Sequence, residues 1–282
     1  MQDQDFSLID DSIIVFRTRE GYVFKAMNEF FHSSLRVLIF RVTSQGIKMR
    51  ADNSKDEEPE SIMVDLNIPN HHFEIVHVPK SLQDDSESEI LLPIDASNFR
   101  SATQGILKKD LLTFYVSKDQ PKELQILIEN REKGRNEEHS VALIDTEILK
   151  TRDINPVMPC SYSIDCPRAV GVASEFQKVC KTANSAKVKT VRVIGKEKGL
   201  MVIIDNGGTV KRFKYGVYRD SDETIYERRF LVKGNLASIA KCCPMSKTVR
   251  FYYEGNKSLL ISLSTGQFGI LDVYLVPYID KE

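Results

Sequence analysis

The sequence has no tryptophan, and cysteine and histidine each occur only five times in 282 residues. The odd number and irregular spacing of the cysteines fit no disulfide framework, so we expect a reducing compartment. These residues are Cys160, Cys166, Cys180, Cys242 and Cys243. The apolar runs are too short to span a bilayer, and the acidic start MQDQDFSLIDD does not resemble a secretory signal. These absences predict an intracellular protein with no membrane partner.

The motifs of metal and covalent catalysis are also missing. There is no CxxC or HExxH, and the His71–His72 pair lies far in sequence from the cysteines, whereas a zinc site needs closely organised ligand pairs. The turn at 206–208 lacks the Lys-Ser/Thr of a phosphate-binding loop. A cysteine-dependent enzyme would need a histidine near a reactive thiol, which the sequence does not place there. We therefore expect no enzyme, no metal and no cofactor.

The chain does have enough length and apolar content for two cores. A length of 282 residues is at or above the usual limit for one domain, so two domains of roughly 130 to 140 residues are expected. Hydrophobic residues make up 41%, and the many phenylalanines, tyrosines and β-branched residues favour sheet. The net charge of −1 argues neither for nor against a nucleic-acid partner.

Strand and helix patterns follow the same order in both halves of the chain. Each half starts with a strand and a helix, continues with several strands, and ends with a second helix and further strands. The predicted helices are 22–35, 97–109 with Ser97 as N-cap, 168–183 and 233–243. The predicted strands of the first half are 12–19, 37–43, 46–50, 62–68, 73–78, 111–117, 123–129 and 140–145. Those of the second half are 163–166, 188–195, 199–205, 209–215, 226–232, 248–253 and a closing hairpin.

Residues 145–162 interrupt this alternation. Pro156 and Pro159 prevent a continuous helix there, so the segment is predicted to be an extended connector. The expected domains are 1–144 and 163–282, and the repeat of topology has a period of roughly 140 residues. The acidic segment 53–61 is predicted to be a solvated loop, and 81–89 a mobile one.

Basic residues concentrate in the four predicted helical segments. Any one helix could carry lysines simply as its solvated face. None of the four segments is net acidic, however, although the chain as a whole is. The spacing groups Arg100 with Lys108, Lys178 with Lys181, and Lys233 with Lys241 on shared helix faces. This distribution favours a surface that faces phosphates. The candidate DNA-binding residues are Lys25, Arg100, Lys108, Lys178, Lys181, Lys233 and Lys241.

The last stretch, SLLISLSTGQFGILDVYLVPYIDKE, is typical of a hairpin that ends at Pro277. An ordinary terminal hairpin would explain it. It also resembles the C-terminus of the archaeal and eukaryotic sliding clamps, the proliferating cell nuclear antigen family. Further stretches resemble helices of these clamps and the strands after them. They are NFRSATQGILKKDLLTFYV, EFQKVCKTANSAKVKTVRVIGKEKGLMVII and FLVKGNLASIAKCCPMSKTVRF.

The resemblance covers nearly the whole chain and is closest over 160–282. It implies the α+β DNA-clamp fold, with two topologically repeated domains that each pack two helices on antiparallel sheets. Three subunits of that family close a ring, and the candidate cations fall on or near its basic pore positions. The implied function is a processivity factor that encircles duplex DNA and tethers DNA polymerase and other replication and repair proteins. A clamp loader, a homotrimer, and a nuclear or viral replication site are implied with it.

The resemblance also implies two kinds of protein contact. Partners of the family insert an apolar-aromatic plug between the connector and the C-terminal strand, although Leu275 and Val276 could instead simply alternate between core and solvent. The implied docking residues are Ala51, Ile154, Val157, Ser258, Tyr274, Leu275, Val276 and Pro277. Subunits of the family join through edge strands, which here would be 140–145 and 209–215.

The chain departs from the family in its longer connector, its longer N-terminus, and His32 in place of a further lysine. Alternatives therefore stay open. One is a checkpoint-type clamp subunit that assembles with non-identical chains into a heterotrimer. Another is a monomeric viral DNA-binding processivity or transcription factor.

Overall fold

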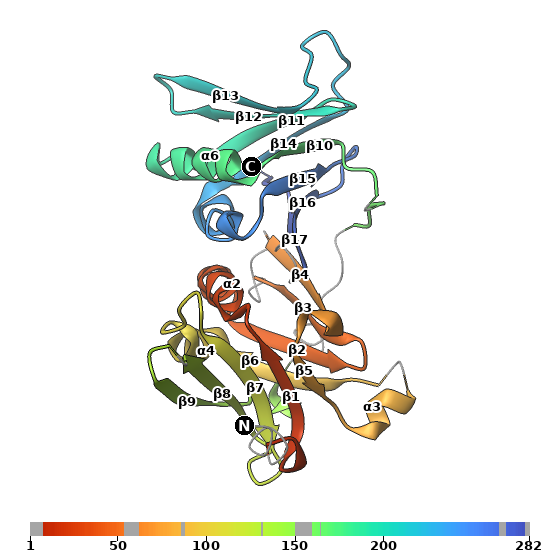
Figure 1. The fold of residues 1–282 in the computed structure, drawn as a ribbon. Coiled ribbons are helices and arrows are strands. Elements are labelled where there is room, and N and C mark those ends of the chain that lie inside the picture. Colours follow the sequence, from red (N-terminus) through yellow and green to blue (C-terminus); the bar gives the residue numbers. More distant parts are fainter. Residues whose placement is uncertain are drawn as a thin grey trace. The chain divides into compact units, whose positions relative to one another are not determined.

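A computed structural model of the chain describes residues 8–53, 62–85, 88–130, 132–149, 160–163, 165–264 and 269–279. The chain separates into two compact units (Figure 1). The first contains residues 1–51, 66–155 and 267–269, and the second 52–65, 156–266 and 270–282. Both combine helices with antiparallel sheets, so the predicted α+β class is confirmed. None of the described helices is long and apolar enough to cross a membrane.

One sheet of the first unit has the strand order β5-β1-β7-β8-β9, with neighbouring strands antiparallel. Its strands are β1 (Ser12–Thr18), β5 (Ile75–His77), β7 (Leu111–Ser117), β8 (Glu123–Asn130) and β9 (Arg135–Ala142). A further group has the order β6-β2-β3-β4. It consists of β2 (Val37–Thr43), β3 (Gly46–Asp52), β4 (Ile62–Pro69) and β6 (Ile90–Asp95).

The core of the first unit is built from aromatic rings that helices α2 (Gly21–Ser34) and α4 (Ala96–Thr103) place on the sheets. Phe24 of α2 meets Phe114 of β7 with ring centroids 4.7 Å apart, and Phe99 of α4 lies 6.0 Å from the same ring. Phe99 also meets Phe40 of β2 at 5.5 Å. Helices and sheets therefore share one apolar interior, which fixes the face of each helix that remains exposed.

The second unit repeats this arrangement. One sheet has the order β10-β15-β16-β17, and the other β13-β12-β11-β14. The strands are β10 (Ala169–Val172), β11 (Thr190–Gly195), β12 (Gly199–Asp205), β13 (Val210–Gly216), β14 (Tyr226–Leu231), β15 (Thr248–Tyr252), β16 (Leu259–Ser264) and β17 (Ile270–Leu275). Phe176 of α6 (Ala173–Ser185) lies 5.2 Å from Phe251 and 6.0 Å from Tyr215, ring to ring, and anchors this helix on the core.

The strand orders confirm the predicted internal repeat of topology. The order β1-β7-β8-β9 reappears as β10-β15-β16-β17, and β6-β2-β3-β4 reappears as β14-β11-β12-β13. Apart from β5, each strand thus has a counterpart in the other repeat: β9 corresponds to β17, and β4 to β13. Residues 150–159 of the predicted connector lie outside the described residues, so the domain boundaries 1–144, 145–162 and 163–282 stay a prediction.

Two predicted helices are shorter than the sequence suggests. Helix α4 ends at Thr103 rather than 109, and its N-cap is Asp95, not Ser97: the Asp95 carboxylate accepts hydrogen bonds from the backbone N–H of Ser97 and Asn98. The segment 233–243 is not one helix either. Lys233 is extended (ψ 131°) and Gly234 has φ +82°, so the helical turns start after Gly234 and include α7 (Ala237–Ile239).

Other differences concern short elements. The predicted strand 163–166 is wrong, because the strand that precedes α6 is β10 at 169–172. Within the predicted mobile loop 81–89, a short helix α3 (Lys80–Asp84) buries Leu82, which is 2% exposed. Strand β9 starts at Arg135, five residues before the predicted edge strand 140–145. The loop 53–61 lies almost entirely outside the described residues.

Candidate nucleic-acid interface

The cations on the helices of the first unit are partly engaged by the protein itself. Phe24 and Met27 on α2 face the core, and Lys25 is half-buried, with its Nζ donating to the carbonyl of Ile106 at 3.1 Å. Arg100 of α4 donates from Nε to Glu29 Oε1 of α2 at 3.1 Å. The predicted positive charge on these helices is therefore partly used to hold α2, α4 and the loop after α4 together.

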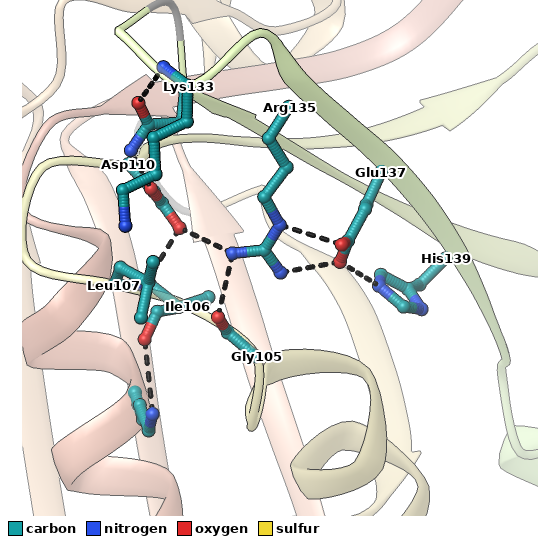
Figure 2. A network of polar contacts seen from close by, with 10 residues as sticks. Gly105, Ile106, Leu107, Asp110, Lys133, Arg135, Glu137 and His139 are labelled. Atoms are coloured by element: carbon teal, nitrogen blue, oxygen red, sulfur yellow. Dashed lines mark hydrogen bonds and ion pairs between the residues drawn. The ribbon is translucent and has the colours of Figure 1, made fainter.

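That loop, residues 104–110, is held by a buried carboxylate (Figure 2). Asp110 is fully buried; its Oδ2 accepts from the backbone N–H of Leu107 at 2.8 Å and from Arg135 Nη1 at 3.1 Å. Its Oδ1 accepts from Asn130 Nδ2 at 2.5 Å. The loop thereby fixes the backbone at Lys108, whose side chain is exposed. Because Lys108 follows the end of α4, it shares no helix face with Arg100, and that part of the sequence prediction was wrong.

Arg135 links the loop to β9. Figure 2 shows its guanidinium between Asp110 and Glu137, with Nε and Nη2 donating to the two carboxylate oxygens of Glu137 at 2.7 and 2.6 Å. Nη1 also donates to the carbonyl of Gly105 at 3.0 Å. The hydrogen bonds from Arg135 hold the pKa of Glu137 below its usual range. This network is structural, and no spacing of residues in the sequence predicts it.

The helix of the second unit presents a more open basic surface. Phe176, Val179 and Ala183 of α6 are buried, and the exposed face carries Lys178 and Lys181. Lys178 makes a surface ion pair with Glu175, with Nζ and Oε1 2.7 Å apart and both side chains more than half exposed. Lys181 makes no ion pair within the described residues. A surface pair of this kind is weak, so both lysines remain available to an external anion.

The segment after β14 adds Lys233 and Lys241 to this surface. Both side chains are exposed, and Gln177 of α6 donates to the carbonyl of Ala240 at 2.8 Å, which joins the segment to α6. Cys243 of this segment is buried, and burial raises its pKa to about 12, although a backbone hydrogen bond and the nearby Lys181 oppose this shift. Lys233 and Lys241 flank the helical turns and share no helix, so their predicted common helix face was also wrong.

No protein-family model matches the sequence, and no curated protein matches it in a sequence comparison. Solved structures do match the fold. Proliferating cellular nuclear antigen from Entamoeba histolytica superposes with a TM-score of 0.73 over 95% of this chain and 100% of that one, at 14% identity. A chain of the PCNA2–PCNA3 complex from Sulfolobus tokodaii gives 0.71 over 93% and 98%, also at 14% identity. This chain has the sliding-clamp fold.

Several residues expected to form a docking groove on the clamp fold are not at the surface. Ala51 and Ser258 are each 6% exposed, Tyr274 is 5% and Leu275 fully buried. Tyr274 is buried because it packs into an apolar cluster of the second unit. The expectation that these four lie at the surface was therefore wrong. Val276 and Pro277 are half-buried, and Ile154 and Val157 lie outside the described residues. A partner-binding role for this region stays a prediction.

The cluster around Tyr274 belongs to the second unit. Its buried members are Met63, Tyr252, Leu260 and Tyr274, and Cys160 and Tyr162 pack against it. The hydroxyl of Tyr162 donates to the carbonyl of Ser258 at 2.5 Å, and Lys257 Nζ lies 5.5 Å from the Tyr162 ring centroid. Residues at the end of the predicted connector therefore cover this part of the sheet. Sequence reasoning could not find Tyr162, since one aromatic in a polar stretch has no periodicity.

Proposed function

We propose that this chain is a DNA sliding clamp, a non-enzymatic ring that encircles duplex DNA and tethers DNA polymerase and other replication and repair proteins in the nucleus. The observation that carries the proposal is the clamp fold of both units combined with the exposed lysines of the second. Lys178, Lys181, Lys233 and Lys241 gather on α6 and the segment joined to it. Such a surface attracts phosphates without selecting a sequence, as a protein that moves along DNA requires.

The internal repeat supports assembly of several copies. Within the second unit, the outer side of β17 is paired with β4, whose first residues, 62–65, belong to that unit. By the repeat, β9 is the counterpart of β17, and β13 the counterpart of β4. In the described part of the chain no strand covers the outer edge of β9 or of β13. The equivalent pairing, β9 of one copy with β13 of the next, would satisfy both edges.

This contact joins different surfaces of two identical chains. Successive copies then form a closed ring when a whole number of equal rotations completes a full turn. Three copies are the number implied by the resemblance to the clamp family. Loading of such a ring on DNA would then require that one contact open, which is the task of a clamp loader.

Tethering of partners is proposed for the exposed part of the C-terminal strand end. Val276 and Pro277 are half-buried apolar residues that follow directly after the buried end of β17. A short apolar-aromatic segment of a polymerase could pack on them, and micromolar affinity is in the range such a contact supports. The change Val276→Asp would place a charge there and is expected to abolish binding of a clamp-interacting peptide without changing the mass of the assembly. Unchanged peptide affinity would move the docking site elsewhere.

A ring of non-identical chains is the second candidate. The observation that favours it is the similarity to a chain of the PCNA2–PCNA3 complex, in which the named components differ. In that case this chain alone would not reach the mass of a closed ring, and its β9 and β13 edges would pair with other clamp chains.

Mass and threading test the proposal. Light scattering of the purified full chain should give about three times 32.1 kDa. The protein is then mixed with a linear duplex, the DNA ends are blocked with a bulky protein, and the salt is raised. Retention only on DNA whose ends were blocked after mixing indicates a topological link. A monomer, or retention that ignores the ends, would contradict the ring, and direct monomeric DNA binding would replace it.

A further inference from the structure

An acidic hollow lies next to the free edge of the first unit, on the face of the sheet away from α2 and α4. Phe114 packs on the helices, so the alternating neighbour Tyr115 points to this other face. Register places Tyr115 beside Gln125 and Gln125 beside Ser140, across β7, β8 and β9. The hollow has a volume of about 520 Å³ and is lined by Tyr115, Ser117, Asp119, Gln120, Glu123, Gln125, Glu138 and Ser140.

The charge inside this hollow is not balanced locally. Three of its lining residues are carboxylates, Asp119, Glu123 and Glu138, and no lysine or arginine is among the described residues that line it. Their contacts within the hollow are with neutral groups: the Tyr115 hydroxyl donates to Glu138, and the Ser140 hydroxyl to Glu123. Glu138 lies on β9 itself, at the open edge of the sheet. A cation supplied from outside would therefore find hydrogen-bonded carboxylates already in place.

The opposite charge occupies the free edge of the second unit. Strand β13 carries the exposed cations Lys211, Arg212 and Lys214. Tyr215 packs on Phe176 of α6, so Arg212 and Lys214, at odd spacing from Tyr215, point to the face away from that helix. Lys214 pairs with the exposed Asp220 at 2.9 Å, whereas Arg212 makes no ion pair within the described residues.

We infer that Arg212 of one copy of this chain enters the acidic hollow of the next copy and pairs with Glu138, with Lys214 beside it. This inference rests on the proposed ring, in which β9 and β13 pair between copies. Antiparallel pairing that keeps both helix layers on one side, and that pairs as much of both strands as possible, places Arg212 opposite Glu138 or opposite Ser140, the next residue on that face. In either register the long side chain of Arg212 reaches Glu138, directly or diagonally.

The charges also select the orientation of the contact. Two β9 edges would bring one acidic hollow against another, and two β13 edges would bring the cations Arg212 and Lys214 of one copy against those of the other. Like charges directly opposite across strands are destabilising, so these symmetric pairings are disfavoured. Only the head-to-tail pairing of β9 with β13 joins opposite charges. The hollow thus favours the β13 edge of a second copy of this chain over its β9 edge, and it thereby sets the direction in which copies add.

A charge-swap series on the full chain tests the inference, with sedimentation velocity as the readout of assembly. The single variants Glu138→Arg and Arg212→Glu are each expected to raise the concentration for half-assembly about tenfold or more. The double variant, which restores the pair with reversed polarity, should return toward the wild-type value. Glu138→Gln, which keeps the shape and a hydrogen-bonding group, should give a smaller loss. Matched controls are Arg219→Glu and Glu223→Arg, exposed residues on the segment between β13 and β14.

Salt and mixing sharpen the result. The distance over which charges interact, the Debye length, falls from about 10 Å at 0.1 M salt to about 3 Å at 1 M. The loss of assembly caused by each single variant should therefore be smaller at high salt. An equimolar mixture of Glu138→Arg with Arg212→Glu should assemble better than either alone, because a contact between the two variants joins opposite charges; a ring of three still contains one contact between like charges. If wild type forms rings and all variants assemble like it, the hollow is not the seat of the contact, and the proposed clamp stands. If wild type stays monomeric, the ring and this inference fall together.

Discussion

The two repeats share one strand order but hold the segment after their second helix by opposite means. In the first repeat the loop 104–110 is held by the ionic group of Asp110 and Arg135, and Lys25 and Arg100 also make internal contacts. In the second repeat the corresponding segment, 240–247, contributes the buried thiols Cys242 and Cys243, and its lysines Lys241 and Lys247 are exposed. The same topology, which apolar packing determines, is therefore compatible with charged residues that make internal contacts in one repeat and are exposed in the other.

This difference assigns the two repeats unequal shares of the proposed work. The contacts of Lys25 and Arg100 with the protein are expected to give the helices of the first repeat the smaller share of the proposed DNA affinity. In the second repeat, Lys178 and Lys181 are exposed on α6, and the helix is anchored by its buried apolar face. Each of the following predictions either removes that asymmetry or measures it.

The largest effect is expected from Asp110→Ala in the first repeat. The change removes a fully buried carboxylate and leaves the Leu107 N–H and the Asn130 amide without their acceptor, whereas Arg135 keeps Glu137 and the Gly105 carbonyl. Each unsatisfied buried group costs about 1–3 kcal/mol, measured as the free energy of unfolding in urea. Glu132→Ala, which breaks the exposed pair with Lys109, serves as control and should cost less than about 1 kcal/mol. Similar losses from the two variants would show that the network is not structural.

The DNA prediction compares the helices of the two repeats directly. Lys181→Glu combined with Lys233→Glu should weaken binding to a short duplex by about ten- to a hundredfold and lower the salt slope by about two. Lys25→Glu combined with Arg100→Glu should have a clearly smaller effect, because these side chains already contact Ile106 and Glu29. Fluorescence anisotropy at several salt concentrations measures both. Equal losses in affinity would abolish the distinction between the repeats.

The repeats should also respond to pH in opposite directions. Burial raises the pKa of Cys180 and Cys242 well above 9.0 in the folded state, so the unfolded state releases protons first as the pH rises. Each thiol therefore makes its whole contribution to the stability of the second repeat below about pH 9. At a pH one unit higher, that contribution has fallen by about 1.4 kcal/mol per thiol. Glu137 has a lowered pKa, so its contribution to the first repeat is full above pH 4.5 and declines below it. Hydrogen exchange resolved by peptide would show which repeat opens first at each extreme.

The smallest effect concerns the helix N-termini. Helix α4 is capped by Asp95, whereas Val172 at the start of α6 makes no side-chain cap. Asp95→Ala should cost about 1 kcal/mol, and Val172→Thr, with Glu175 at the third helical position, should add about 0.5–1 kcal/mol through a capping box. Thermal unfolding would resolve both. A loss of stability in the threonine variant would mean that exposed Val172 serves the strand rather than the helix.

Elements with a local pattern could be predicted from the sequence, whereas contacts between residues far apart in the sequence could not. Helices α2 and α6 and the strand alternation have apolar periods of their own, so sequence predicts them, and the repeat with them. The contacts that neutralise Lys25 and Arg100 lie 81 and 71 residues away, where local pattern carries no information. The early end of α4 depends on Asp110 and Arg135 in the same way. Burial of Tyr274 needed the packing of Met63 and Tyr252, which only the assembled sheet provides.

The separate positions of the β9 and β13 edges also have a genetic consequence. A copy altered only at Arg212 keeps an intact β9 edge and would still be accepted by the β13 edge of a normal copy. It would then present a defective edge of its own and leave the ring open. When both alleles are expressed, most rings would contain at least one such copy, so alterations of β13 are expected to be dominant rather than recessive.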